Sequence, residues 1–220
     1  MGELTTGLRA AKKARTRDSI ASAALPLFLA RGFDVVTLAE IAAAADVSVK
    51  TVLNHFGSKE DIYLDRSPAI VAGVRDAVAQ GALDGRVTLA PLRRLLSDNR
   101  MPGTGVGWDA LDDPGHYAQV ARFMSTMLAS RVLTLRWHAM FDDVRGAVGG
   151  ALTAGGLAPQ RDVSLLAAMI TAVVAESNRV VVGHLMSGAP RATVEADARA
   201  LVADGLDRVA RAFPDLVAGG

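Results

Sequence analysis

The chain has 220 residues, half of them apolar and 21% charged, with a formal net charge of +1. This length allows one large domain or two domains with separate cores. The absence of cysteine excludes disulfides and thiolate metal sites, and it fits a reducing, cytoplasmic compartment. Because the total charge is close to zero, any affinity for an anionic partner must come from a local concentration of cations.

Such a concentration lies near the N-terminus. Five cationic side chains fall within residues 9–17, and all four lysines of the chain lie within its first 59 residues. A local basic stripe beside a compact motif is typical of nucleic-acid binding. We expect residues 1–15 to form a flexible basic arm that follows the DNA backbone or a groove. The DNA contacts predicted in and directly after this arm are Lys12, Lys13, Arg15 and Arg17.

Helical periodicity dominates the rest of the sequence, and no segment shows a convincing strand pattern, so the expected fold class is all-α. A first helix is predicted over residues 12–31, with Gly32 as its left-handed stop and a bend caused by Pro26. Thr37-Leu-Ala-Glu40 is a capping box that starts a second helix. Ser48 and Ser58 are predicted N-caps of two further short helices.

Residues 41–61, IAAAADVSVKTVLNHFGSKED, indicate two short helices joined by a tight turn. Small alanines let the two helix axes cross closely, and Asp46 is one of the few residues that tolerate the left-handed backbone of the turn. This pattern predicts a helix-turn-helix, whose second helix enters the major groove of DNA. The side chains of this helix that we expect to form an apolar, core-facing stripe are Val49, Val52, Leu53 and Phe56.

The other side of this helix carries side chains suited to DNA. Asn54 can pair bidentately with adenine, and Lys50 can reach O6 and N7 of guanine. Thr51 and His55 are expected to hold phosphates. Lys59 lies in the first turn of the next helix, where a cation opposes the helix dipole unless it shares a phosphate with the helix amides. The remaining predicted DNA contacts are Thr37, Ser48 and Val49.

Residues 16–65 resemble the DNA-binding domain of the TetR family of bacterial transcriptional regulators. The resemblance is carried by Ala24-Leu-Pro-Leu-Phe28, Arg31-Gly-Phe33, Thr37-Leu-Ala-Glu-Ile41, Val47-Ser48, Thr51, His55-Phe56 and Ser58-Lys-Glu60. It implies a homodimer whose two helix-turn-helix units read a palindromic DNA operator. It further implies repression that is relieved when a small apolar ligand binds the second domain. Leu53 departs from the family pattern, which usually has an aromatic residue there.

The resemblance assigns residues 66–216 to a helical domain for ligand binding and dimerisation. Long helical patterns are expected over residues 116–156, with a break near Ser130, and over residues 162–186 and 193–212. Methionines and aromatic residues in these helices suit either a packed core or a cavity for apolar ligands. The candidate ligand contacts are Trp108, Phe123, Met124, Met127, Trp137, Met140, Phe141, Glu176 and Asn178.

The helices predicted over residues 162–186 and 193–212 also suit a four-helix dimer interface. Glu176 and Arg179 are three residues apart, so an intrahelical ion pair explains them as well as a ligand contact does. The candidate interface residues are Val173, Val180, Val181, His184, Leu185, Leu201, Leu206 and Val209.

Two alternatives stay open at this point. His138 and Asp142 are four residues apart on a predicted helix, as in a catalytic dyad or half of a metal site. No nucleophile, complete ligand set or oxyanion signature accompanies them, so we expect no enzyme activity, metal or cofactor. The second alternative is a ligand-binding helical protein without a DNA role, which the apolar Leu53 in the recognition helix keeps open.

Overall fold

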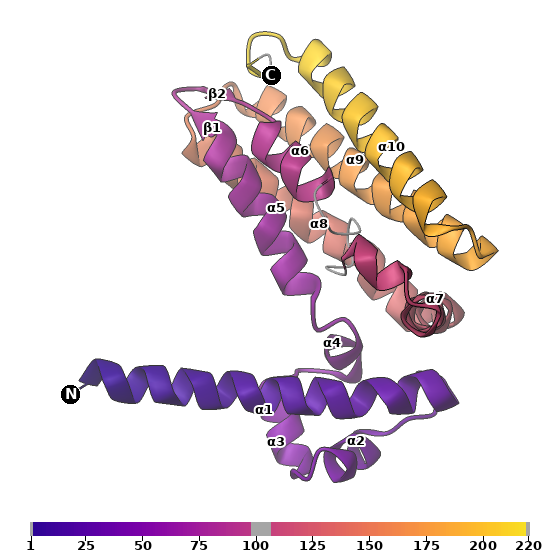
Figure 1. Ribbon diagram of the computed structural model, residues 1–220. Helices are drawn as coiled ribbons and strands as arrows, with labels where there is room; N and C mark the ends of the chain where they lie inside the picture. The colour runs from indigo at the N-terminus through magenta and orange to yellow at the C-terminus, as the bar shows by residue number, and fades with distance from the viewer. Residues whose placement is uncertain (1, 98–106, 219–220) are drawn as a thin grey trace. The chain divides into compact units, whose positions relative to one another are not determined.

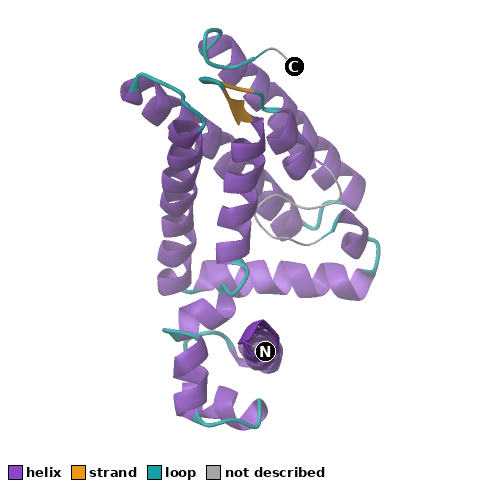
Figure 2. Cartoon of the chain, turned by 90° about the vertical axis from the view of Figure 1, so that its left-hand side faces the viewer, coloured by secondary structure: helices purple, strands orange, loops and turns teal. Residues whose placement is uncertain are grey.

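The computed structural model describes residues 2–97 and 107–218, mostly as helices (Figure 1). The chain divides into two compact units. The first consists of Met1–Asp65 with Ser125–Arg136, and the second of Arg66–Met124 with Trp137–Gly220. The all-α class is confirmed, because the strands within the described residues amount to one small hairpin (Figure 2).

The first unit contains the predicted helix-turn-helix. Its α1 lies against α2, α3 and α4 and buries one side formed by Ile20, Ala24 and Phe28, which recur every four residues (Figure 1). Asp46 has a φ of 52° in the turn between α2 and α3, which confirms the predicted left-handed backbone. The helices of this unit are α1 (Gly2–Arg31), α2 (Leu38–Ala44), α3 (Val49–His55) and α4 (Lys59–Tyr63).

The basic N-terminal segment is helical, so the expectation of a flexible arm is wrong for its described part. Helix α1 begins at Gly2 and runs without interruption to Arg31. Residues 8–15 are Leu, Ala, Lys and Arg, which are all strong helix formers, and this propensity accounts for the extension. The helix also continues through Pro26, although the proline ring removes one backbone donor.

Side-chain caps start α2, α3 and α4, as the sequence predicts. Oγ1 of Thr37 accepts a hydrogen bond from the amide of Glu40 at 3.3 Å, and Oε2 of Glu40 accepts one from the amide of Thr37 at 2.8 Å. These reciprocal bonds form the capping box and satisfy donors that a helix start leaves free. Ser48 and Ser58 each accept from the amide three residues later, at 3.0 Å and 3.1 Å.

Three aromatic rings close the core of the first unit. The ring of Phe28 lies 5.2 Å from that of Phe33 and 5.4 Å from that of Tyr63, and the latter two rings are 5.7 Å apart, centroid to centroid. Such tilted and edge-on pairs are worth about 0.5–1.5 kcal/mol beyond their area of burial. Burial also raises the pKa of the Tyr63 phenol above its ordinary value.

The segment 125–136, at the end of α7 and the start of α8, completes the first unit. Ser130 Oγ donates a hydrogen bond to Oδ1 of Asp34 at 3.0 Å. Arg136 Nη2 pairs with Oδ1 of Asp61 at 3.0 Å. The first unit is therefore assembled from two stretches of sequence that are about sixty residues apart, a separation far longer than a usual connecting loop.

The second unit is built around long helices, and the predicted break near Ser130 is confirmed. Helix α5 had not been predicted, because its small apolar residues and Gly73 give a weak helical pattern. Residues 125–136, at the end of α7 and the start of α8, belong to the first unit, and the rest of the following elements belong to the second. The elements are α5 (Ser67–Gly81), β1 (Ala82–Leu83), β2 (Arg86–Val87), α6 (Ala90–Ser97), the short 3₁₀ helix η1 (Trp108–Leu111), α7 (Pro114–Ala129), α8 (Arg131–Ala154), α9 (Gln160–Ser187) and α10 (Arg191–Ala212).

Helix α9 supplies much of the core of the second unit. Leu166, Ile170, Val174 and Val181 are each 0% exposed along its inner side. By length and composition α9 could cross a membrane, since its 28 residues have a window with a mean hydropathy of 1.6. Half of that window is buried inside the protein, as expected for the core helix of a globular unit.

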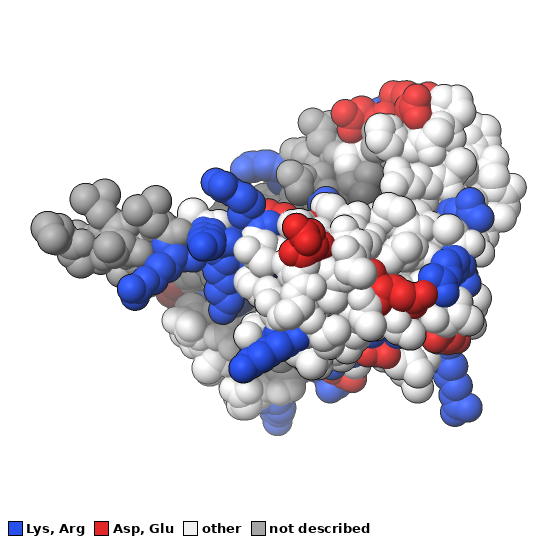
Figure 3. Space-filling model, turned by 90° about the horizontal axis from the view of Figure 1, so that it is seen from below, with Lys and Arg blue, Asp and Glu red and all other residues white. Residues whose placement is uncertain are grey.

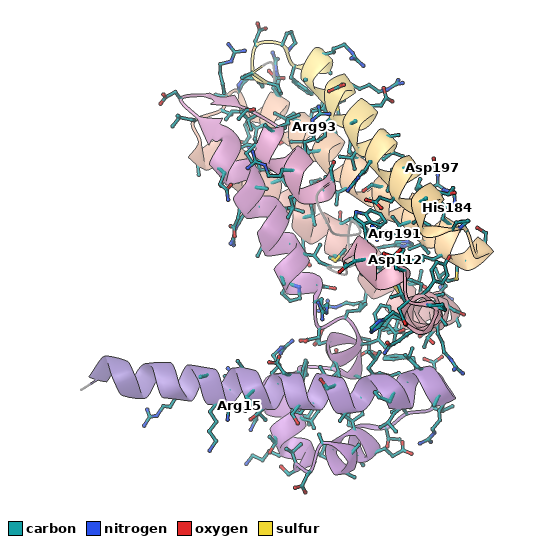
Figure 4. The ribbon with its side chains drawn as sticks, in the orientation of Figure 1. Arg15, Arg93, Asp112, His184, Arg191 and Asp197 are labelled. Atoms are coloured by element: carbon teal, nitrogen blue, oxygen red, sulfur yellow. The ribbon has the colours of Figure 1, made fainter. Side chains whose placement is uncertain are left out.

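Charged side chains of α10 hold the two segments that precede and follow residues 98–106. Arg191 pairs with Asp112 (Figure 4), and Nε of Arg199 donates a hydrogen bond to the Ser97 carbonyl at 3.0 Å. Glu195 pairs with both arginines, at 3.3 Å and 2.7 Å. The hydrogen bond from Arg191 lowers the pKa of the Asp112 carboxyl.

Substitutions at two glycines test the close approach of Gly81, at the end of α5, to the backbone of Thr88. A Cβ atom added to Gly81 would lie 2.1 Å from the carbonyl oxygen of Thr88, whereas one added to Gly146 on α8 would meet nothing within 4 Å. We expect Gly81→Ala to lower the free energy of unfolding by about 1–3 kcal/mol through this overlap. Gly146→Ala should raise it by up to about 1 kcal/mol, because alanine favours a helix. Urea unfolding of both variants measures this, and shifts in the same direction would contradict it.

The capping box predicts a pH dependence. The hydrogen bond from the Thr37 backbone, with bonds from Arg31 and the Thr37 hydroxyl, lowers the pKa of Glu40 from 4.5 to about 2. Because the folded-state pKa is the lower one, ionised Glu40 stabilises the fold fully above about pH 4.5, and this stabilisation is lost as the pH falls through about 2.

Glu40→Gln keeps the shape of the cap and removes the charge. The difference in thermal midpoint between this variant and the natural chain should be constant near pH 7 and shrink between about pH 4.5 and pH 2. A difference that does not change across this window would show that the charge of Glu40 does not stabilise the cap.

Candidate DNA-binding face

Helix α3 packs one narrow side into the first unit. Val52 is 0% exposed and Phe56, which caps the helix, is 2% exposed. Val49 and Leu53 are 38% and 47% exposed, so the predicted four-residue apolar stripe is wrong for these two. Positions 52 and 56 lie one turn apart, whereas residues one and three positions from Val52 point about 100° and 60° away from it on a helix.

The exposed side of α3 combines polar and apolar groups. Lys50 and Asn54, the predicted base contacts, are exposed. Leu53 lies between them in sequence and is also exposed. An exposed apolar side chain on such a helix is able to contact the methyl group of thymine, and the assignment of Leu53 to the core left this possibility out. Thr51 and His55 are half-buried, and Nδ1 of His55 is buried without a hydrogen-bond partner in the described chain.

The hydroxyl groups predicted to contact DNA are used in helix caps. Oγ1 of Thr37 lies 2.8 Å from Oε2 of Glu40, in addition to its bond with the Glu40 amide. Oγ of Ser48 accepts from the Thr51 amide and lies 2.9 Å from Oγ1 of Thr51. These residues therefore fix where α2 and α3 begin, and their contact with phosphates stays a prediction.

Arg17, predicted as a backbone contact, points into the first unit instead. Its Nη1 donates a hydrogen bond to the carbonyl of His55 at 2.5 Å, and its Nη2 pairs with Oδ1 of Asp65 at 2.5 Å. Its Cζ lies 3.9 Å from the centroid of the Phe56 ring. The prediction of a direct DNA contact is corrected for Arg17, because these partners already engage both ends and one face of the guanidinium.

Lys59 is also turned inward. Its ammonium group donates to the carbonyl groups of Phe33 at 2.8 Å, Asp34 at 3.2 Å and Val36 at 2.9 Å. It also lies 4.4 Å from the centroid of the Phe33 ring. Since an ammonium group has three N–H donors, all of them are used, and the predicted phosphate contact of Lys59 is corrected. Lys59 instead ties the start of α4 to the segment that precedes α2.

The cations of the N-terminal half of α1 remain on the surface. Seen from below, blue side chains gather on part of this face (Figure 3). Arg15 is labelled on α1 in Figure 4, and Lys12 and Lys13 precede it by three and two residues in the sequence. A helical row of exposed cations matches the phosphate backbone of nucleic acid. The exposed cations of this row are Arg9, Lys12, Lys13 and Arg15.

The candidate ligand contacts are mostly buried. Glu176 forms the predicted ion pair with Arg179, whose Nε donates to Oε2 at 2.8 Å, and this bond lowers the pKa of the Glu176 carboxyl. Trp108 is 1% exposed, and its indole N–H has no hydrogen-bond partner in the described chain. The buried candidates are Trp108, Met124, Met127, Trp137, Met140 and Asn178, and the half-buried ones are Phe123, Phe141 and Glu176. Met127 belongs to the first unit and the others to the second.

The predicted dimer interface is largely the inside of the second unit. Helices α9 and α10 pack against each other, which uses their most apolar sides within one chain. His184 Nε2 lies 2.8 Å from Oδ2 of Asp197 across this pair (Figure 4). The prediction is therefore corrected for the residues that are buried in the chain, which are Val173, Val181, Leu185, Leu206 and Val209. Val180, His184 and Leu201 are half-buried.

The outer side of α9 carries a different set. Ala172 and Gly183 are exposed, and near the ends of the helix Leu165 and Met186 are 55% and 40% exposed. Successive positions in this set are 7, 11 and 3 residues apart, which are close to whole numbers of helical turns, so they share one side of the helix.

The catalytic alternative gains nothing from the structure. His138 and Asp142 are both exposed on α8, and Asp142 pairs with Arg145 at 3.2 Å. Within the described residues, no group of three or more histidine or acidic side chains could hold a metal ion.

Comparison with known proteins finds a family match for the helix-turn-helix. Residues 20–65 match the family model described as bacterial regulatory proteins, tetR family. The transcriptional regulator TcmR of Streptomyces glaucescens is 45% identical over 64 residues, which cover 29% of this chain and 28% of TcmR. The match thus spans little more than a quarter of that relative.

Solved structures extend the likeness to the whole fold. A TetR-family regulator from Mesorhizobium loti has a TM-score of 0.51 at 19% identity, covering 89% of this chain and 97% of that one. SmeT of Stenotrophomonas maltophilia in complex with triclosan has a TM-score of 0.51 at 23% identity, covering 90% of this chain and 91% of SmeT. The chain thus resembles the TetR family of bacterial regulatory proteins over residues 20–65, and it shares the fold of solved TetR-family structures.

Proposed function

We propose that this protein is a sequence-specific DNA-binding transcriptional regulator. In this proposal it is a cytoplasmic homodimer that represses from a palindromic operator and is released by a small apolar ligand. The observation that carries the proposal is the exposed face of α3, where Lys50, Leu53 and Asn54 stand out from a helix anchored by buried Val52.

The α3 face supplies base readout, and α1 supplies charge. Bidentate contacts of the kind that Lys50 and Asn54 can make discriminate between bases by about 1–3 kcal/mol each. The exposed cations of α1, including Lys12 and Arg15, can neutralise phosphates irrespective of sequence. Each neutralised phosphate adds about 0.9 to the dependence of log K on log salt concentration.

Dimerisation sets where two α3 helices meet the DNA. Two half-sites read on one side of the duplex lie about 34–36 Å apart, or a multiple of this distance. The outer side of α9, with exposed Ala172 and Gly183, is the surface that supports our proposal of a dimer, because small residues let a partner helix approach closely.

Ligand control needs a modest coupling between the two units. Buried thioethers and aromatic rings such as Met124, Met140 and Trp137 favour an apolar ligand. The indole N–H of Trp108, which has no hydrogen-bond partner among the described residues, offers it one donor. A coupling of about 1–3 kcal/mol between ligand and DNA binding would change operator affinity about 5- to 150-fold. Triclosan, which SmeT binds, is a suitable first probe.

Selection of bound sequences from random duplex DNA tests the proposal directly. We expect enrichment of a palindrome, with affinity that falls as salt concentration rises. The same selection with triclosan tests release. Dimerisation without any sequence enrichment would favour the alternative of a helical ligand-binding protein that has no DNA role.

Substitutions on α3 and α1 should have different effects on the selected site. Lys50→Ala and Asn54→Ala should each reduce preference for the matching base by about 1–3 kcal/mol, because they remove base contacts. Arg15→Gln should weaken binding to all sequences equally and lower the salt slope by about 0.9, because it removes a phosphate contact. Competition binding at several salt concentrations measures both effects. Unchanged base preference in both α3 variants would exclude the proposed readout.

A charge on the outer side of α9 should separate the protomers. Ala172→Glu places a carboxylate at the proposed interface, where its burial would be unfavourable without a partner. We expect a monomer in sedimentation and a large loss of operator affinity. Ala79→Glu is the matched control, because it makes the same change of charge at an exposed position of α5. This variant should remain a dimer. A dimer in both variants would place the interface elsewhere.

A further inference from the structure

We propose that Arg17 positions the recognition helix, so that it controls DNA binding without contacting DNA. We call the set formed by Arg17, the His55 carbonyl, the Phe56 ring and Asp65 the Arg17 bracket. The inference rests on the proposed function, because it concerns how α3 meets its DNA site. It assigns a positioning role to a cation that the sequence alone marks as a DNA contact.

The geometry of the bracket depends on a guanidinium group. Arg17 reaches the His55 carbonyl with one terminal nitrogen and Asp65 with the other, each at 2.5 Å. Its flat face rests on the Phe56 ring, with Cζ 3.9 Å from the ring centroid. A planar group with five N–H donors can make these contacts at once, whereas an ammonium group is a point charge without a stacking face.

The bracket contacts the C-terminal end of α3, a short helix that packs into the unit through few side chains. Helix α3 has seven residues and one buried side chain, Val52. Its last carbonyl groups have no partners within the helix, and a cation there is favourable to the helix dipole. Arg17 supplies such a cation at His55, one residue after Asn54. Because bidentate base contacts require fixed geometry, a shift of this end would misplace the base-reading side chains.

Charge balance argues against a phosphate role for Arg17. Its ion pair with Asp65 joins two side chains that are 34% and 24% exposed, so the carboxylate already compensates the cation. Arg15 is exposed two residues earlier on the same helix, with no ion pair in the described chain. Arg15 and Arg17 thus form a matched pair with opposite expected behaviour.

The first test compares these two arginines on the selected DNA site and on random duplex. We expect Arg17→Gln to weaken binding to the selected site about tenfold or more, as for the loss of a charge-assisted hydrogen bond, while the salt slope stays unchanged. Binding to random duplex should change little, so the specificity ratio falls. Arg15→Gln should lower the slope by about 0.9 and weaken both DNAs alike. Arg17→Lys should restore only part of the loss.

The second test uses the acidic partner, for which the two roles predict opposite signs. Removing a carboxylate near bound DNA raises affinity if charge alone matters, since repulsion of phosphate is removed. Under the positioning role, Asp65→Asn lowers affinity for the selected site, because Arg17 loses its anchor. Asp18→Asn removes an exposed carboxylate next to Arg17 in sequence and should leave affinity equal or higher. Higher affinity of Asp65→Asn would overturn the proposal.

A measurement without DNA keeps this inference separate from the proposed function. Hydrogen exchange should become faster at the amides of residues 49–56 in Arg17→Gln and Asp65→Asn, and stay unchanged in Arg15→Gln. Failure of the natural chain to select any DNA, with this exchange pattern intact, would refute the proposed function but not the bracket. Unchanged exchange, or a salt slope lowered by about 0.9 in Arg17→Gln, would overturn the bracket.

Discussion

Burial of one side of α3 against the rest of the first unit is the constraint on which the DNA-binding face depends. An isolated helix of this length does not persist in water, so α3 exists because its surroundings impose it. Ser48 caps its N-terminus, and the left-handed backbone at Asp46 sets the direction in which the chain enters it. The buried side chains of Val52 and Phe56 pack it against the rest of the unit. The residues that remain outside, above all Lys50 and Asn54, have no part in this packing and form the face that we propose reads bases.

The cations of the first unit serve two different purposes. Arg17 and Lys59 are bound to carbonyl groups and a carboxylate far along the chain, and they join elements of the fold. The cations from Arg9 to Arg15 and Lys50 lie on the surface and remain available to phosphates and bases. Counting charges in a sequence does not separate the two groups, because the distinction is made by partners that are 38 and 26 residues away.

The sequence predicted the features that depend on neighbouring residues and missed those that depend on tertiary packing. The caps at Thr37 and Ser48 and the turn at Asp46 involve atoms within four residues, and all were predicted correctly. The exposure of Leu53 and the burial of dimer candidates such as Val181 were not, because an apolar residue does not show which neighbour covers it. The helix over residues 8–15 was also missed, because we expected a charged terminus to be mobile although these residues have high helix propensity.

The discontinuity of the first unit limits how this fold can be recombined. Its core ends in sequence at Asp65, yet Ser130 and Arg136 bind Asp34 and Asp61 from a stretch that belongs to α7 and α8. A gene fusion that ends the transferred segment after residue 65 would therefore carry the helix-turn-helix without the hydrogen bond from Ser130 and the ion pair with Arg136. A functional chimera has to take residues 125–136 from the same donor as residues 1–65, because both segments belong to the first unit. The second unit of this architecture therefore cannot be exchanged by a single cut in the chain.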